Sequence, residues 1–388
     1  MRFFAAVILA VSMVLPTIAA PSPLHTVQKY DGETTGKYIV QFKKGASRKT
    51  WIKKLKLTNK VADWDLVNGF GGDIDEATLE ELRASDEVES IHEDGVMYAF
   101  APVTQTNAPW GLARISQDAK LSSTSTSALT YTYNYDSTAG AGVDIYVVDT
   151  GINTAHTDFG GRAVWGASFN NLGNSDGNGH GTHCAGTAAG TRYGVAKAAK
   201  VIAVKVLSDS GSGATTGIVS GLNWVLSQAK ASGRPSVVSM SLGGSASTAL
   251  DNAVTSLTSA GIHVVVAAGN DGKNAANTSP ARTPSAITVG ATTISDAIAS
   301  YSNYGAVVDI FAPGTAITST WIGSTTATNS ISGTSMATPH VAGLVAYLIG
   351  KDGNLSPAAM ASKLVSLSVK NALTGIPSGT VNYLANNA

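Results

Sequence analysis

The chain of 388 residues is long enough for one large and one small domain, and its 44% hydrophobic and 13% charged residues indicate a globular protein, not a disordered one. The formal net charge is zero, which gives no electrostatic reason to expect nucleic acid or an anionic membrane as a partner. Cys184 is the only cysteine, which excludes an intramolecular disulfide.

The first twenty residues have the pattern of an export signal. Arg2 supplies a positive start, residues 3–15 form an apolar stretch, and residues 17–20 are small or apolar enough for a cleavage region. The apolar stretch is too short to span a bilayer comfortably. We therefore expect a secreted, extracellular protein from which residues 1–20 are removed.

Charge density separates residues 1–103 from the rest of the chain. The first part holds 12 basic and 14 acidic side chains, and the much longer remainder holds 14 and 12, with no glutamate. Such a change marks a boundary between two differently built segments. Within 37–100 the pattern predicts a small α+β domain of βαββαβ order, with strands over 37–43, 65–70 and 88–92 and helices over 47–57 and 77–84.

Residues 101–142 are polar and rich in turn-forming residues, whereas the following sequence alternates strands and helices. The strands are nearly continuous apolar runs, which predicts a mainly parallel sheet between helices in a three-layer α/β domain. The strands are expected over 143–148, 201–207, 236–242, 262–268, 286–289 and 307–311, and the helices over 180–189, 216–231, 249–260 and 335–349.

Three segments place reactive side chains where such a fold exposes them. Asp149 closes the strand over 143–148, His180 follows a glycine-rich approach to a helix, and Ser335 stands just ahead of an apolar helix. Active sites of open parallel sheets gather at the carboxyl ends of the strands. A serine hydroxyl needs a base to become a nucleophile, and an imidazole base needs an acid to orient it.

These segments resemble known active-site signatures. Asp149-Thr-Gly151, His180-Gly-Thr-His-Cys-Ala-Gly186 and Gly333-Thr-Ser-Met-Ala-Thr-Pro-His340 are similar to the three signatures of subtilisin-like serine peptidases, and they follow the chain order of subtilisin. The resemblance extends to the proteinase K branch, which includes fungal cuticle-degrading peptidases, through Gln105-Thr-Asn-Ala-Pro-Trp-Gly-Leu-Ala-Arg114, Ser241-Leu-Gly-Gly244, Ala267-Ala-Gly-Asn270 and Ser300-Tyr-Ser-Asn-Tyr-Gly305.

The resemblance implies a role for each of four residues. Asp149 would orient the imidazole, His180 would act as general base and then acid, and Ser335 would be the nucleophile. Asn270 and the backbone N–H of Ser335 would donate hydrogen bonds to the oxyanion. Taken alone, Asn270 fits a turn after a buried strand better than an oxyanion donor, and the neighbouring signatures reverse that preference.

The resemblance also implies a peptide-binding cleft. Two segments would hold an extended substrate between them, and small residues would line the primary pocket, which implies broad specificity with a preference for apolar or aromatic residues before the cut. The alternative is that these glycines only terminate strands. The expected cleft residues are Gly211, Ser212, Gly213, Ser241, Leu242, Gly243 and Gly244, with Ala267 and Gly269 in the pocket.

A structural calcium ion is implied at one site. Asp309 matches a family ligand, and the carbonyl groups of Pro284 and Ala286 would complete the protein part of a hard-oxygen site. The alternative is a solvated aspartate near a sheet edge. A second family site near the carboxyl terminus is not expected, because Ser366 and Ser368 stand where an aspartate is wanted.

Two histidines and the cysteine lie close in sequence to the predicted catalytic residues. His183 and Cys184 follow His180, but the segment lacks the His-Glu-x-x-His pattern of zinc peptidases, so we interpret His183 as a packing residue. His340 is interpreted as structural. Cys184 is expected to be a buried, inert thiol.

Residues 21–102 resemble an inhibitor-like propeptide of this family. The domains are therefore expected at 1–20, 21–102 and 103–388, and we expect a monomeric enzyme that degrades extracellular protein and cuts itself near residues 100–103. Its partners would be protein or peptide substrates and its own propeptide, which acts as an intramolecular inhibitor.

Other classes fit the sequence less well. A catalytically inactive binding module would need a broken triad, and an α/β-hydrolase would need Gly-x-Ser-x-Gly with the order Ser, Asp, His. A processing peptidase of narrow specificity stays open, although the expected cleft segments hold few acidic residues to read basic substrates.

Overall fold

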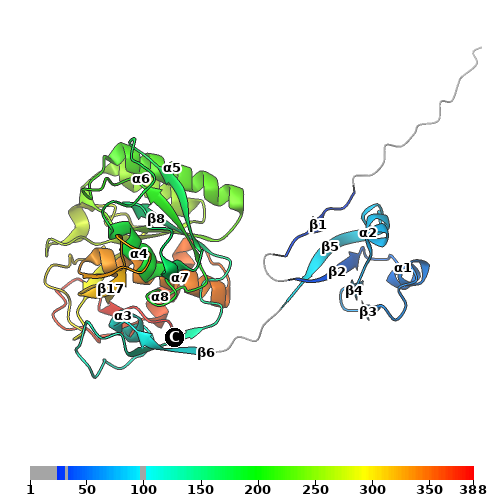
Figure 1. Ribbon diagram of the computed structural model, residues 1–388, viewed down its shortest axis with the longest axis horizontal. Helices are drawn as coiled ribbons and strands as arrows, with labels where there is room; N and C mark the ends of the chain where they lie inside the picture. The colour runs from blue at the N-terminus through cyan, green and yellow to red at the C-terminus, as the bar shows by residue number, and fades with distance from the viewer. Residues whose placement is uncertain (1–23, 31–33, 97–101) are drawn as a thin grey trace, which may run out of the picture. The chain divides into compact units, whose positions relative to one another are not determined.

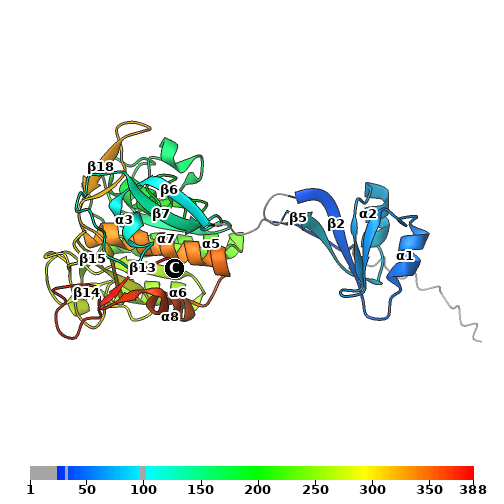
Figure 2. The same ribbon diagram turned by 90° about the horizontal axis from the view of Figure 1, so that it is seen from below.

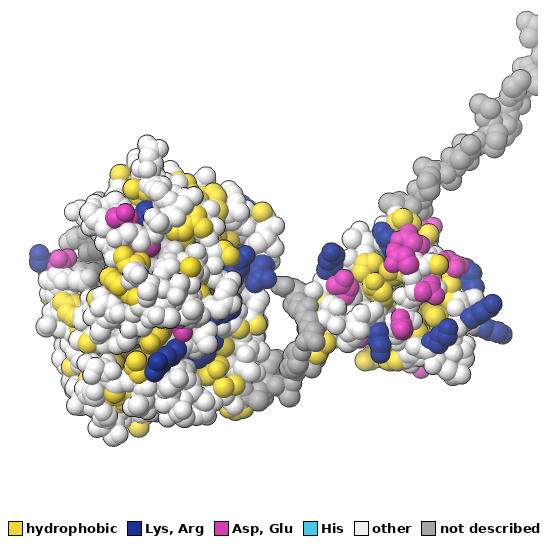
Figure 3. Space-filling view, viewed as in Figure 1, with side chains coloured by type: hydrophobic (Ala, Val, Ile, Leu, Met, Phe, Trp, Pro, Cys, Tyr) yellow, Lys and Arg dark blue, Asp and Glu magenta, His cyan; other side chains and the backbone are white. Residues whose placement is uncertain are grey.

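The computed structural model describes residues 24–30, 34–96 and 102–388 (Figure 1). The chain divides into two compact units, residues 1–99 and 100–388. The predicted export signal over 1–20 lies outside the described residues, as do residues 100 and 101 of the predicted cleavage region. Figure 3 shows that charged side chains are much denser on the small unit than on the visible face of the large unit.

The small unit is a five-stranded sheet with two helices, in which the strand order is β1-β5-β2-β4-β3. Its segment from β2 to β5 has the predicted βαββαβ order, and Asp75 caps the second helix by accepting a hydrogen bond from Thr78 N at 2.8 Å. The elements are β1 (Val27–Gln28), β2 (Thr34–Phe42), α1 (Arg48–Lys54), β3 (Val61–Trp64), β4 (Gly69–Gly72), α2 (Glu76–Arg83) and β5 (Val88–Gly95).

The predicted strand over 65–70 is wrong. Residues 65–68 form the turn between β3 and β4, and Asn68 adopts a φ of +43°, which suits a turn and not a strand. Leu66 is 96% exposed at this turn. Asparagine tolerates such a φ better than most residues, and this turn joins two short strands where the apolar residues suggested one.

The large unit contains a nine-stranded sheet in the order β19-β20-β16-β15-β13-β11-β8-β10-β9. All neighbouring strands pair in parallel except β19 and β20, so the predicted mainly parallel sheet is confirmed. The strands are β8 (Asp144–Asp149), β9 (Ala163–Ser168), β10 (Lys200–Lys205), β11 (Ser236–Met240), β13 (His263–Ala267), β15 (Ile287–Thr292), β16 (Ile310–Pro313), β19 (Val369–Lys370) and β20 (Tyr383–Leu384).

Helices cover both faces of this sheet (Figures 1 and 2). Ile145 and Val147 of β8 belong to the core shared with α4 and α7, whereas Tyr146 and Val148 belong to the core shared with α5 and α6. Alternate side chains of a strand face opposite sides, which explains the continuous apolar run. The helices are α3 (Trp110–Arg114), α4 (His180–Ala189), α5 (Thr215–Ser232), α6 (Thr248–Ser259), α7 (Thr334–Asp352) and α8 (Pro357–Leu367).

Three two-stranded sheets accompany the main one. One of them, β6 with β7, lies in the polar, turn-rich stretch where no strand was predicted. The alternating Tyr131, Tyr133 and Tyr135 form a strand there, and its central ring is fully buried. Residues 122–127 within that stretch are irregular, as expected. The paired strands are β6 (Pro102–Ala108) with β7 (Tyr131–Asp136), β12 (Gly244–Ser245) with β14 (Thr278–Ser279), and β17 (Ile317–Thr320) with β18 (Thr328–Ile331); η1 (Thr157–Phe159) and η2 (Ala275–Asn277) are 3-10 turns.

The parallel arrangement brings the carboxyl ends of β8, β11 and β13 to one edge of the sheet. β8 ends at Asp149, Ser241 follows β11, and the segment with Asn270 follows β13. The edge is therefore where the predicted catalytic residues gather. None of the helices among the described residues is both long and apolar enough to cross a membrane.

Candidate active site

Asp149 and His180 form a hydrogen-bonded pair at the end of β8. Asp149 is fully buried, and its Oδ1 lies 2.8 Å from Nδ1 of His180, the first residue of α4. The same oxygen accepts a hydrogen bond from Thr150 N at 2.7 Å. Because Nδ1 faces a carboxylate, it carries the proton and leaves Nε2 to accept one.

The charge of Asp149 and burial shift the pKa of His180 in opposite directions. Burial alone lowers the pKa of His180, but the adjacent Asp149 carboxylate outweighs it and raises the pKa well above the usual value. The pair is thus arranged to stabilise a positive charge on His180, which is the charge that a general base acquires when it takes a proton.

The loop before α4 is held by Asp176. Its Oδ1 accepts hydrogen bonds from Thr150 Oγ1 at 2.9 Å and from Gly179 N at 2.9 Å, and its Oδ2 accepts from Thr182 N at 3.0 Å. Thr150 Oγ1 in turn accepts from Gly181 N at 2.9 Å. One carboxylate therefore ties the start of α4 to the residue after Asp149, a role that sequence reasoning did not assign although Asp176 stands four residues before His180.

Ser335 lies in the first turn of α7, next to Ser241. Its Oγ donates a hydrogen bond to the carbonyl oxygen of Ser241 at 3.2 Å, and its own carbonyl accepts from Ser241 Oγ at 2.8 Å. Cys184 Sγ lies 3.4 Å from the same carbonyl of Ser335 and 4.0 Å from His180 Nδ1. These contacts bring the helix that carries Ser335 against the helix that begins with His180.

Asn270 and the backbone of Ser335 present donors to one open position. Thr334 donates two hydrogen bonds to Asn270 Oδ1, from its N atom at 2.8 Å and from its Oγ1 at 2.9 Å. The carboxamide oxygen of Asn270 therefore faces Thr334, and its NH₂ group points away from Thr334. A methyl group on the Cα of Gly333 would lie 3.5 Å from both Asn270 Nδ2 and Ser335 N. The glycine thus leaves space where two N–H donors converge, as stabilisation of an oxyanion requires.

Two buried histidines near the site make local contacts. His183 Nε2 lies 2.8 Å from the carbonyl oxygen of Ile317, and burial lowers the pKa of His183 to about 3. His340 Nδ1 lies 2.8 Å from the carbonyl oxygen of Met336, and burial lowers the pKa of His340 to about 4. Both imidazoles are therefore neutral, which agrees with a packing role.

Asp149, His180 and Cys184 also form the one cluster of three possible metal ligands found among the described residues, with ligand atoms within 4.8 Å of one another. Burial raises the pKa of the Cys184 thiol. Because a thiolate and not a thiol binds metals well, this cluster fits a hydrogen-bonded catalytic pair better than a metal centre.

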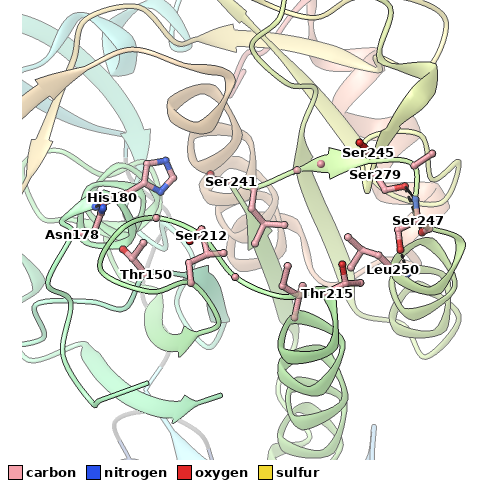
Figure 4. A pocket seen from close by; sticks show the side chains of 18 residues that line it. Thr150, Asn178, His180, Ser212, Thr215, Ser241, Ser245, Ser247, Leu250 and Ser279 are labelled. Atoms are coloured by element: carbon pink, nitrogen blue, oxygen red, sulfur yellow. Dashed lines mark hydrogen bonds between the residues drawn. The ribbon is translucent and has the colours of Figure 1, made fainter. Parts of the chain in front are cut away.

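Two cavities meet at Ser241–Gly244. The first, of about 650 Å³, is lined by His180, Gly211, Ser212 and Gly213 on one side and has the apolar residues Leu207, Ile218 and Leu250 in its wall. Figure 4 shows His180 and Ser212 beside Ser241, with Thr215 and Leu250 farther along. The second cavity, of about 690 Å³, is lined by the predicted pocket residues Ala267 and Gly269. Asn270 and Ser335 also line it.

Every residue that sequence reasoning placed in the cleft lines one of these cavities. Leu207, Ile218 and Leu250 were not predicted there, because they belong to strand ends and helices whose apolar residues are indistinguishable in sequence from core residues. Their position gives the first cavity an apolar wall.

Asp309 directly precedes β16 and contacts the beginning of the neighbouring strand β15. Its Oδ2 accepts a hydrogen bond from Thr288 N at 2.8 Å, two residues after Ala286. Burial raises the pKa of Asp309 to about 6. Asp309 is half-buried and has no cationic side-chain partner among the described residues, so its carboxylate is the kind of oxygen ligand that a hard cation such as calcium takes.

Comparison with known proteins agrees with this geometry. The sequence model of the subtilase family matches residues 140–381. The chain belongs to the subtilase family. It is 46% identical to a cuticle-degrading protease of Metarhizium anisopliae, over 98% of this chain and 96% of that protein. It is 45% identical to a cuticle-degrading serine protease of Arthrobotrys oligospora, over 96% of each chain.

A solved structure supports the same assignment for the fold. The crystal structure of a cold adapted subtilisin-like serine proteinase matches with a TM-score of 0.66 and 46% identity, and the match covers 73% of this chain and 99% of that one. The subtilase is thus a subtilisin-like serine endopeptidase, and the predicted three-layer fold is confirmed.

Proposed function

We propose that Ser335 is the nucleophile of this subtilase, with His180 as general base and acid, Asp149 as the orienting carboxylate and Asn270 as an oxyanion donor. The observation that carries the proposal is the meeting of the Asp149–His180 pair with Ser335 and Asn270 around two adjoining cavities. Three segments far apart in sequence supply a base, a nucleophile and a charge-stabilising donor.

The acylation step begins when Ser335 Oγ leaves the carbonyl of Ser241 and turns toward His180. Oγ attacks the carbonyl carbon of the scissile bond while His180 Nε2 takes its proton. The carbonyl oxygen becomes an oxyanion, which accepts hydrogen bonds from Asn270 Nδ2 and Ser335 N. His180 then gives the proton to the leaving amine, the C–N bond breaks, and an acyl-enzyme ester remains.

Deacylation uses the same groups in reverse. A water molecule loses a proton to His180 Nε2 and attacks the ester carbon, and a second oxyanion forms in the same position. When the C–Oγ bond breaks, His180 returns the proton to Ser335 Oγ. Throughout, Asp149 Oδ1 accepts the Nδ1–H bond and stabilises the imidazolium.

The cleft supports broad specificity for proteins with apolar or aromatic residues before the cut. An extended peptide between Gly211–Gly213 and Ser241–Gly244 would be held by main-chain hydrogen bonds, which carry little sequence preference. Gly244, where a side chain would meet nothing within 4 Å, leaves the backbone accessible, and Leu207 and Leu250 add an apolar wall. Two relatives are named cuticle-degrading proteases, which supports our proposal that this enzyme degrades extracellular protein such as cuticle.

We also propose that the chain is exported as a zymogen. Residues 1–20 would be the signal, residues 21–102 a self-inhibiting propeptide, and residues 103–388 the mature enzyme, with self-cleavage near 100–103. The densely charged small unit with its own core supports a separately folded segment. If the Ser335→Ala chain were exported from a peptidase-deficient host and still cut at this point, self-processing would be wrong.

A structural calcium ion is proposed at Asp309, with the carbonyl groups of Pro284 and Ala286. The ion would supply positive charge to the half-buried Asp309 carboxylate just before β16 and would stabilise the adjoining ends of β15 and β16.

The direct test of the proposed activity compares the wild-type and Ser335→Ala chains on denatured protein. The wild-type enzyme should digest it and react with a serine-directed fluorophosphonate, and Ser335→Ala should do neither. Equal digestion by both chains would refute the mechanism.

A further inference from the structure

The segment that carries Asn270 has no regular secondary structure. It runs over residues 268–273, directly after β13, and Gly269 within it has a φ of +106°, a value that L side chains rarely adopt. Only its first residue is held by the sheet, because Ala268 N donates to the carbonyl oxygen of Val289 at 3.0 Å, and residues 269–273 lie beyond that pairing. The direction of the Asn270 side chain must depend on contacts from elsewhere in the fold.

Asn303 supplies these contacts from a segment about 30 residues farther along the chain. Its side chain is buried, and Nδ2 donates a hydrogen bond to the carbonyl oxygen of Ala268 at 2.9 Å. Its Oδ1 accepts from Asp271 N at 3.1 Å and from Lys273 N at 3.0 Å. One carboxamide thus holds the backbone on both sides of Asn270.

The main chain of Asn303 adds a further hydrogen bond to the same segment. Asn303 N donates to the carbonyl oxygen of Gly269 at 2.9 Å, and a methyl group on Gly269 would lie only 2.3 Å from Asn303 Nδ2. The two residues are therefore in contact at a distance that only glycine permits. The backbone of Asn270 is fixed from one side by Asn303, whereas its side-chain oxygen is fixed from the other by Thr334.

We propose that Asn303 is a positioning residue that directs the Nδ2–H bond of Asn270 toward the oxyanion. The inference rests on the proposed role of Asn270. Asn303 makes none of the contacts to reacting atoms and acts through the backbone of residues 268–273. A carboxamide of this length is required because the site uses one oxygen that accepts two N–H bonds and one nitrogen that donates.

Two substitutions separate the parts of this interaction. Asn303→Asp keeps an acceptor for Asp271 N and Lys273 N but loses the donor to Ala268, and Asn303→Leu removes every side-chain hydrogen bond at similar volume. We expect Asn303→Leu to lower kcat by about tenfold or more, which is part of the about 10²–10³ that complete loss of an oxyanion donor costs. Asn303→Asp should retain more activity than Asn303→Leu.

The decisive measurement is a double-mutant cycle with Asn270→Ala. All variants are expressed as full-length chains. Variants that mature slowly are processed with tagged wild-type enzyme, which is then removed by its tag. The concentration of active sites in each preparation is measured with a fluorophosphonate. If Asn303 acts through Asn270, Asn303→Asp and Asn303→Leu should change kcat by less than about twofold once Asn270 is alanine, because the donor that they misdirect is gone. An undiminished loss in the Asn270→Ala background would overturn the proposal.

A matched variant controls for loss of stability. Asn387 is 5% exposed, and its Nδ2 donates to the carbonyl oxygen of Asn134 at 2.8 Å, away from residues 268–273. Asn387→Leu should lower Tm with unchanged kcat per active site. If Asn387→Leu lowers kcat as much as Asn303→Leu does, the effect of Asn303 is general destabilisation and the proposal fails.

The single variant Asn270→Ala tests the role of Asn270 independently of Asn303. If Asn270→Ala alone leaves kcat unchanged, the oxyanion assignment is wrong, and the positioning role of Asn303 is wrong with it. If Asn303→Leu does not fold, the cycle with Asn303→Asp gives the same answer.

Discussion

Nδ1 of His180 lies 2.8 Å from Oδ1 of Asp149, a carboxylate that is completely buried at the end of β8. The second oxygen of Asp149 has no hydrogen-bond partner in the part of the chain that the structure describes. The imidazole is therefore the main side-chain partner of a buried negative charge. This relationship determines how activity should depend on pH.

Activity should rise as the pH rises through the pKa of His180. Only the neutral imidazole can take a proton from Ser335, and Asp149 raises the pKa of His180 well above the usual 6.5 despite burial. The acidic limb of the kcat/KM profile should therefore lie above the pH at which an isolated histidine titrates. A limb at or below that pH in the wild-type enzyme would contradict this arrangement.

Asp149→Asn should lower kcat by about 10⁴, because the amide no longer fixes the Nδ1–H tautomer. The residual activity should have an acidic limb at lower pH than in the wild type, since the charge that raises the pKa of His180 is gone. Asp209→Asn is the matched control: Asp209 is an exposed acid paired with Lys205 at 2.8 Å, and its loss should leave the limb in place.

Asn270→Ala should reduce kcat by about 10²–10³ with a much smaller change in KM, because the hydrogen bond to the oxyanion is strongest in the transition state. Asn270→Asp provides a sharper comparison. It keeps an oxygen for Thr334 but has no N–H to donate, so it should also lose most of its kcat. Steady-state kinetics on a peptide substrate would show this, and full activity of the aspartate variant would speak against a donor role.

Gly244→Val should raise KM for long peptides several-fold without lowering Tm. A side chain at Gly244 meets nothing within 4 Å in the protein, yet the residue lines both cavities. The added methyl groups therefore obstruct only a bound substrate. Gly173→Val is the control, because Gly173 is equally open and lines neither cavity; similar KM values for both variants would argue against the proposed cleft.

Calcium should stabilise the enzyme more at pH 7 than at pH 4. Without the ion, burial raises the folded-state pKa of Asp309 from 3.8 to about 6, so this group favours the folded state when protonated, and that contribution is lost as the pH rises through about 6. The ion pairs with the ionised form and offsets this loss. Chelation should lower Tm at neutral pH in the wild type and much less in Asp309→Ala, whereas no chelator effect in the wild type would eliminate the site.

The sequence was sufficient to select the candidate residues that the fold brings together but not the contacts that hold them. Asp149, His180 and Ser335 stand in local signatures beside strand and helix ends, so their type and spacing were informative. The contacts of Thr334 with Asn270 and of Asn303 with residues 268–273 join segments that are 64 and about 30 residues apart. Such contacts depend on tertiary packing, which no local pattern encodes.

The errors in the fold prediction have a related cause. The apolar residues of 65–70 suggested one strand, but Leu66 is exposed in a turn and Phe70 alone enters the core. The β6–β7 pair was missed because the alternating tyrosines of β7 lie in a polar, turn-rich stretch, and only Tyr133 is fully buried. Local pattern was reliable for strands that are buried on both faces, and both errors fall on strands that are buried on only one face.

Turnover by the Ser335→Ala enzyme, measured beside Ser330→Ala, tests most directly whether Ser335 is the nucleophile. Ser330 is an exposed serine on β18 that lines neither cavity, so its loss should leave kcat unchanged and the fluorophosphonate adduct on the peptide that contains residue 335. Ser335→Ala should form no adduct and should lose about 10⁶ in kcat, as expected when the nucleophile of such a triad is removed. Retention of wild-type turnover by Ser335→Ala, or an adduct on any other residue, would show that Ser335 is not the nucleophile.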